Sequence, residues 1–265
     1  MNRVTSVFTF ALMGIAMAFL TASASAIPIE YGDFGPDYKP GITMYLDVVE
    51  SSGTDPVPPP KYGEPTLTGD TLDFDPTTFV ASATGGDADI TDGQLNFTLM
   101  VMEANGQVAG GVTSLLITES GDFTLAGAGA ASQVIGGVSL DIDILEVDGQ
   151  PIDPISVFAS STITRDLQND GPIVLAPWNN GLLVELGPAL AENNVNFQFG
   201  VTKAEIAIDD QLIAISEPAT VAFIAKKDFT IEPGTEPNPE FVIPEPATLA
   251  SALLLIAAAS RLRRV

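Results

Sequence analysis

The chain has 265 residues, of which 34 are acidic and 10 basic, and it contains neither His nor Cys, so its formal net charge is -24. The missing residue types exclude a Ser-His-Asp triad, a Cys nucleophile, a zinc site built from His or thiolate, and a Cys-ligated iron–sulfur cluster. A charge this negative repels phosphate backbones, which argues against nucleic-acid binding. Hydrophobic residues make up 46% of the chain, whereas disordered acidic chains have low hydrophobicity, so we expect a folded domain with an acidic surface.

The first residues have the three parts of a secretory signal peptide. Arg3 is followed by an apolar run over residues 8–20 and then by small residues that end at Ala26. Signal peptidase recognises a basic start, a short apolar stretch and small residues just before the cut. We therefore expect a signal helix over 1–26 and cleavage after Ala26, with Ala24 as the second small residue of the recognition site. A cut after Ala24 is the alternative.

Residues 244–265 also have three parts in a fixed order. A Pro-Glu-Pro triplet precedes an apolar run over 247–259, and a basic cluster follows. The prolines prevent a helix from extending backwards, and the apolar run would span roughly 20 Å of a hydrocarbon core that is ~30 Å thick. A basic cluster favours the cytoplasmic face of a membrane. The residues are Pro244, Glu245 and Pro246 in the triplet and Arg261, Arg263 and Arg264 in the cluster.

This tail resembles the PEP-CTERM sorting signal of exported bacterial proteins. The resemblance covers residues 244–265 only. It implies that an exosortase-type membrane protease recognises and removes the tail after its helix has entered the inner membrane of a Gram-negative-type bacterium that makes extracellular polysaccharide. An ordinary single-pass anchor is the alternative. Both interpretations place the body of the protein, whose residues 27–243 hold 33 acidic and six basic residues, outside the cytoplasm.

The body divides by composition into three segments. Residues 27–63 are rich in Pro and Gly and contain one strand candidate over 42–50, so we expect an N-terminal extension there. Residues 64–231 alternate polar and apolar side chains in short runs separated by turn residues, which is typical of β-strands. Residues 232–243 are polar and proline-rich and are predicted to form a stalk before the tail.

The strand pattern predicts an all-β fold, an antiparallel β-sandwich of jelly-roll type with the signal helix and the sorting helix at its ends. A phase change near Lys203 predicts a bulge, and residues 188–193 are the one candidate helix inside the body. Turns are expected at Asn105-Gly106, Asp148-Gly149 and Asp209-Asp210. The expected strands lie over 94–102, 112–118, 138–144, 196–208, 212–215 and 220–231.

Three carboxylates between Gly86 and Gly93 form the densest acidic group, and they suggest Ca²⁺ as a cofactor. Asp87, Asp89 and Asp92 would supply oxygen atoms, which Ca²⁺ requires in numbers of six to eight. The spacing departs from an EF-hand, because Asp92 falls one position late and Thr98 occupies the place of the closing Glu. A solvated turn whose carboxylates accept backbone hydrogen bonds is the alternative.

Two further patterns suggest binding or hydrolysis of carbohydrate. Asp73 with Asp75, and Asp141 with Asp143, would share a strand face, and paired carboxylates serve glycoside hydrolases. Trp178, the only Trp, lies in a loop-like stretch with amide neighbours, where it could stack on a sugar; the alternative is an anchor to the core.

These observations predict a non-enzymatic, exported cell-surface or extracellular-matrix protein that associates with exopolysaccharide or the envelope. Its expected partners are signal peptidase and the export machinery, the exosortase-type protease and an extracellular polysaccharide, with no nucleic acid. The alternatives are a Ca²⁺-dependent carbohydrate-binding module and a secreted, carboxylate-based glycoside hydrolase.

Overall fold

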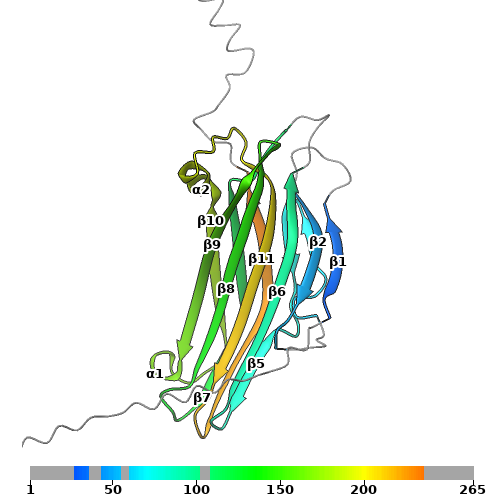
Figure 1. Cartoon of the computed structure of the whole chain (residues 1–265). Coiled ribbons are helices and arrows are strands. Elements are labelled where there is room, and N and C mark those ends of the chain that lie inside the picture. The colour runs from blue at the N-terminus through cyan, green and yellow to red at the C-terminus, as the bar shows by residue number, and fades with distance from the viewer. Residues whose placement is uncertain (1–26, 36–42, 55–59, 102–107, 236–265) are drawn as a thin grey trace, which may run out of the picture.

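Two antiparallel β-sheets pack face to face in the computed structural model, which describes residues 27–35, 43–54, 60–101 and 108–235 (Figure 1). The predicted antiparallel sandwich is therefore confirmed, while the jelly-roll winding stays a prediction. The signal segment, the sorting tail and the Asn105-Gly106 turn lie outside the described residues. In the part of the chain that is described, no helix has the length and apolar character needed to cross a membrane.

Six strands form the first sheet, which we call sheet A. Every neighbouring pair in it is antiparallel, and β11 lies near its centre between β6 and β8. The order across the sheet is β1 (Ile29–Phe34), β2 (Thr43–Ser51), β6 (Ala88–Val101), β11 (Val201–Ile215), β8 (Gln133–Val147) and β9 (Gln150–Asp166).

The second sheet, sheet B, is built around β12. The strand β5 (Val80–Thr84) pairs with the first half of β12, and β4 pairs with its second half. Two short helices, α1 (Leu167–Asp170) and α2 (Leu186–Glu192), flank β10. The order across the sheet is β10 (Ile173–Glu185), β7 (Ser114–Gly127), β12 (Thr220–Gly234), β4 (Thr71–Phe74) and β3 (Thr66–Thr68).

Alternation along each strand places one set of side chains in the core between the sheets and the other set outside. In β8, Leu140, Ile142 and Ile144 are buried, whereas Asp141 and Asp143 point outward. The centre of the core is aromatic, because the Tyr62 ring lies 5.2 Å from the Phe79 ring and 5.1 Å from the Phe229 ring. Edge-to-face contacts of this kind add to the free energy gained by burying the rings.

Several local predictions are confirmed. Asp148 and Gly149, with φ of 51° and 73°, make the two-residue turn between β8 and β9. The Asp148 carboxylate also accepts hydrogen bonds from the backbone N–H groups of Phe199 at 2.8 Å and Gly200 at 3.0 Å. The register between β11 and β8 shifts at Lys203, where a bulge was expected. The predicted helix forms as α2, which begins two residues earlier and ends one residue earlier than expected.

Three further features differ from the prediction, besides the shifted ends of most other strands. The extension over 27–63 contributes β1 and β2 to sheet A and places Tyr62 in the core, so it is part of the sandwich. Asp209 and Asp210 do not turn the chain, because β11 continues through both. The last strand runs to Gly234, three residues into the expected stalk, where it pairs with the start of β7.

A glycine allows β7 and β12 to approach each other at the centre of sheet B. Gly121 pairs with Lys226 of β12 on one side and with Trp178 of β10 on the other. A Cβ atom at Gly121 would lie 1.9 Å from the carbonyl oxygen of Ala225. Since this contact involves backbone atoms, the two strands would have to separate.

We therefore expect Gly121→Ala to lower the free energy of unfolding by about 2 kcal/mol or more. Chemical denaturation measures the loss. Gly181→Ala in β10 is the matched control, because its Cβ would meet only the Ile117 carbonyl oxygen at 3.9 Å, and we expect a change within about 0.5 kcal/mol. Equal stability of the two variants would contradict the packing described for β7 and β12.

Candidate functional site

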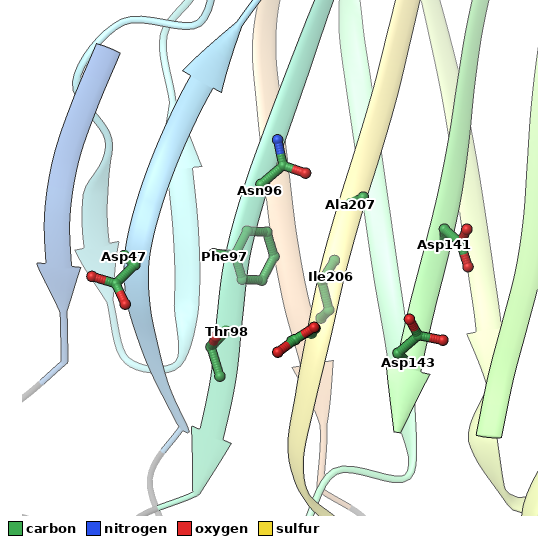
Figure 2. A pocket seen from close by; sticks show the side chains of 9 residues that line it. Asp47, Asn96, Phe97, Thr98, Asp141, Asp143, Ile206 and Ala207 are labelled. Atoms are coloured by element: carbon green, nitrogen blue, oxygen red, sulfur yellow. The ribbon is translucent and has the colours of Figure 1, made fainter. Parts of the chain in front are cut away.

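The outer face of sheet A is hollowed at its centre (Figure 2). This hollow, which we call hollow 1, has a volume of about 330 Å³. Figure 2 shows Asp141 and Asp143 on β8, Asn96 and Thr98 on β6, and Asp47 on β2. The lining residues are Asp47, Asn96, Phe97, Thr98, Asp141, Asp143, Glu205, Ile206 and Ala207.

Strand register brings the lining side chains of hollow 1 together. Glu205 of β11 pairs with Thr98 on one side and with Asp143 on the other. One step along the strand, Ala207 pairs with Asn96 and Asp141. Outward residues of paired strands line up in rows across a sheet, and the short side chain of Ala207 leaves room between its longer neighbours. The prediction that Asp141 and Asp143 share one face of a strand is therefore confirmed.

A second hollow, hollow 2, continues the same face with a volume of about 390 Å³. Asp209 pairs with Gln94 and Ser139, and Gln211 pairs with Asp92 and Gly137. Ser160 and Thr162 of β9 complete these two rows. Hollows 1 and 2 thus share one surface of four successive rows, in which nearly every side chain carries a hydrogen-bonding group.

The charge of this face is strongly negative. Burial raises the pKa of Asp209, and the neighbouring Asp92 carboxylate raises it further. Clefts lined by charges of one sign concentrate ligands of the opposite sign. Anions are therefore disfavoured here, and neutral or cationic ligands are not. The carboxylates that line the two hollows from outside the core are Asp47, Asp92, Asp141, Asp143, Glu205 and Asp209.

An exposed aromatic side chain lies beside hollow 1. Phe158 of β9 is 71% exposed and pairs with Asp141. Sequence reasoning missed this residue. The sequence could have indicated its position, because Ser156, Phe158 and Ser160 are alternate residues of one strand. Alternate residues point to the same face, and the two serines mark this face as the outer one.

Trp178 lies in the core, which corrects the loop and sugar-stacking surface predicted for it. The residue belongs to β10 and is only 3% exposed. Its indole Nε1–H donates a hydrogen bond to the carbonyl oxygen of Ala225 at 3.0 Å. The alternative interpretation, an anchor to the core, is the one that the structure supports.

The three acids proposed for Ca²⁺ serve separate backbone segments. Asp89 accepts a hydrogen bond from the Ser82 N–H at 2.7 Å, and Asp87 accepts one from the N–H of the next residue. Asp89 and Asp92 lie within β6, so the predicted loop is the start of a strand. Across the described ranges, no group of three or more acidic side chains has a geometry suited to a metal ion.

Asp92 holds the segment that follows β2. Its carboxylate accepts hydrogen bonds from the N–H groups of Gly53 and Thr54, both at 2.7 Å, and from the Ser52 hydroxyl at 3.1 Å. Burial alone would raise the pKa of Asp92, but the hydrogen bonds from Thr54, Gly53 and Ser52 outweigh it, and the pKa is lowered. Asp73 differs, because burial and the nearby Asp228 and Asp75 raise its pKa.

A buried ionic cluster lies behind this face, in the core. Lys226 of β12 is 1% exposed, and its Nζ contacts both Asp210 Oδ2 of β11 and Glu119 Oε2 of β7. Burial lowers the pKa of Lys226 to about 8, although Glu119 opposes this shift. Sequence reasoning missed the cluster and interpreted Asp210 as part of a turn. The available signal was alternation, because Glu119, Asp210 and Lys226 each fall in the apolar, inward-facing series of their strand.

Comparisons with known proteins give distant likenesses. No protein-family model and no curated protein matches the sequence. Among solved structures, TmCBM61 in complex with β-1,4-galactotriose is 10% identical over 63% of this chain and 73% of that chain, with a TM-score of 0.20. The enzymatically active domain of bacteriophage CBA120 tailspike protein 4 is 12% identical over 76% of this chain and 19% of that chain, with a TM-score of 0.18. With TM-scores this low, the two likenesses say nothing about what this chain binds.

Removing the Asp92 carboxylate tests its structural role. Because folding lowers its pKa, the carboxylate stabilises the folded state above its ordinary pKa of about 3.9, and this stabilisation is lost as the pH falls through the lower folded value. We expect Asp92→Asn to reduce the free energy of unfolding by about 1 kcal/mol at neutral pH. Denaturation at several pH values should show this difference shrinking in acid. Asp153→Asn, at an exposed position of β9, is the control, and a difference independent of pH would contradict the role.

Proposed function

We propose that this chain is a non-enzymatic, exported surface or matrix protein that binds a neutral or cationic polysaccharide on the outer face of sheet A. The observation that carries the proposal is the set of four polar rows, with hollows 1 and 2 side by side and an exposed Phe158 next to them. For the sandwich itself we propose the jelly-roll winding that the sequence predicts.

The chemistry of the rows suits a chain of sugars. Sugar hydroxyls both donate and accept hydrogen bonds, so they match carboxylates such as Asp141, which accept, and amides such as Asn96, which do both. The volumes of the two hollows fall in the range of small-ligand sites. Adjacent hollows on one open face suit successive units of a polymer, and the Phe158 ring offers an apolar surface for the C–H face of a sugar.

Electrostatics selects among polysaccharides. The carboxylates that line the hollows would repel uronic acids, sulfates and phosphates. Neutral glycans are not repelled by these carboxylates, and glycans with protonated amino groups are attracted to them. The face therefore favours neutral or cationic polymers over anionic ones, unless divalent cations bridge the like charges.

The export part of the proposal rests on the two ends of the sequence. The signal-like residues before Ile27 and the PEP-CTERM-like tail over 244–265 support delivery to the surface, with the exosortase-type protease as a partner. Both segments lie outside the described residues.

Binding is tested on immobilised polysaccharides of three charges: a neutral glucan or galactan, a glucosamine polymer and a uronic-acid polymer. We expect binding to one of the first two and not to the third. Phe158→Ala and Asp141→Ala should each weaken it about tenfold, the equivalent of about 1.4 kcal/mol. Leu183→Ala is the matched control for Phe158, because Leu183 is 56% exposed on sheet B. Binding to the uronic-acid polymer alone, or full affinity in both site variants, would overturn the proposal.

The same assay separates the alternatives. Binding that requires Ca²⁺ and disappears with a chelator would replace this proposal with the Ca²⁺-dependent module. Release of new reducing ends, lost in Asp141→Asn and Asp143→Asn, would replace it with the glycoside hydrolase.

Processing is tested by mass spectrometry of the protein from its native cell surface. We expect an N-terminus at Ile27 and a C-terminus that lacks the basic cluster. Glu245→Ala should leave the tail attached and the protein in the membrane fraction, whereas Glu240→Ala, four residues before the triplet, should be processed normally. A surface protein that still carries Met1 or Val265 would contradict the sorting interpretation.

A further inference from the structure

Three charged side chains meet in the core with no access to solvent. Lys226 Nζ is in direct contact with Asp210 Oδ2 and with Glu119 Oε2, and the side chains of all three residues are 0% exposed. The residues come from β12, β11 and β7, so the contact between Lys226 and Asp210 joins sheet B to sheet A.

The surroundings of the lysine are apolar and aromatic. Lys226 Nζ lies 4.8 Å from the centre of the Phe79 ring and 4.9 Å from that of the Phe229 ring. Removing an ammonium and two carboxylates from water carries a large desolvation cost. Within the described residues, Asp210 Oδ1 is buried and has no hydrogen-bond partner. A permanent ion pair is therefore a poorly satisfied state for these groups.

We propose that Lys226 and Asp210 condense inside the folded core to an isopeptide bond, with Glu119 as the proton carrier. A proton first passes from the Lys226 ammonium to the Asp210 carboxylate. The Nζ lone pair then attacks Asp210 Cγ, the C=O electron pair moves to oxygen, and Glu119 takes a proton from Nζ. Glu119 returns this proton to the Asp210 hydroxyl, which leaves as water while the C=O bond re-forms. The sum is one ammonium and one carboxylate giving one amide and one water.

Neighbouring groups hold Glu119 and Asp210 in place for these steps. Asn180 donates a hydrogen bond to Glu119 Oε1 at 2.7 Å, which leaves Oε2 directed at Lys226. Asn180 is itself held by the Ser161 hydroxyl at 2.6 Å. The Tyr62 hydroxyl lies 3.4 Å from Asp210 Oδ2 and 3.1 Å from the Gly93 carbonyl oxygen, so it helps to hold the Asp210 carboxylate in place against Lys226.

Burial makes the amine a nucleophile and protects the product. A lysine whose pKa is lowered to about 8 by burial has a larger neutral fraction at neutral pH than an ordinary lysine. Once formed, the amide is shielded from the water that would hydrolyse it, and its formation removes one positive and one negative buried charge.

The neighbouring ion pair between Lys227 and Asp122 shows the effect of burial on Lys226. Lys227 contacts Asp122, but the Lys227 side chain is 60% exposed. Water therefore solvates its ammonium, and Glu119 contacts Lys226 instead. Lys227 serves as the matched control, because it follows Lys226 in β12 and also contacts a carboxylate of β7, but its own side chain is exposed.

The experiment uses the full chain, unfolded in denaturant and digested with a protease that cuts after Phe and Leu. Cleavage after Leu212 and Phe223 separates Asp210 from Lys226. We expect mass spectrometry of the wild type to find fragment 200–212 joined to fragment 224–229, lighter by one water than their sum. Lys227→Arg should give the same joined fragment. Lys226→Arg, which keeps the charge, should give only separate fragments.

Glu119→Gln tests the proton carrier. We expect this variant to fold, by circular dichroism, and to accumulate the joined fragment at least ten times more slowly. Equal rates in this variant and the wild type would overturn the assignment of Glu119. Separate fragments from folded wild-type protein would overturn the bond itself, and this result does not depend on whether any variant folds.

Discussion

The contact of Lys226 with Asp210 and Glu119 determines how the two sheets meet. A buried cation must face buried carboxylates, so β12, β11 and β7 have a single relative position that satisfies the core. The bulge between Lys226 and Asp228 lets Lys226 and Phe229 both point inward, and Gly121 lets the bulged strand lie close to β7. Trp178 also belongs to this region, because its Nε1–H donates a hydrogen bond to the carbonyl oxygen of Ala225, the same atom that lies against Gly121.

The same contact fixes the outer face. Asp210 points into the core, so Asp209 and Gln211, its neighbours in β11, must point outward into hollow 2. Ala207 and Glu205, which precede Asp209 in β11 at alternate positions, also point outward and line hollow 1. A shift of β11 by one residue would place every outward side chain inside. The core ion cluster therefore selects the register in which the polar rows of the candidate site exist.

Local patterns in the sequence predicted the elements whose formation depends on near neighbours. The alternation in β8, the Asp148-Gly149 turn and the bulge at Lys203 were all predicted, because each depends on a few adjacent residues. Asp210 was misinterpreted because its partner Lys226 lies 16 residues away and on the other sheet. Trp178 was misplaced for a similar reason, since its burial depends on β12. The shared face of Asp141 and Asp143 was predicted, but the hollow was not, because it requires the register of four strands.

A sandwich without Cys has no disulfide to hold its sheets together. An ion pair in the core depends on the protonation of Lys226, and this protonation changes at alkaline pH because burial lowers its pKa to about 8. An amide does not titrate and is not weakened by salt. The proposed bond would join β11 to β12, and hence sheet A to sheet B, beneath the face that we propose binds polysaccharide. Force applied by a bound polymer to sheet A would then reach sheet B through a covalent link.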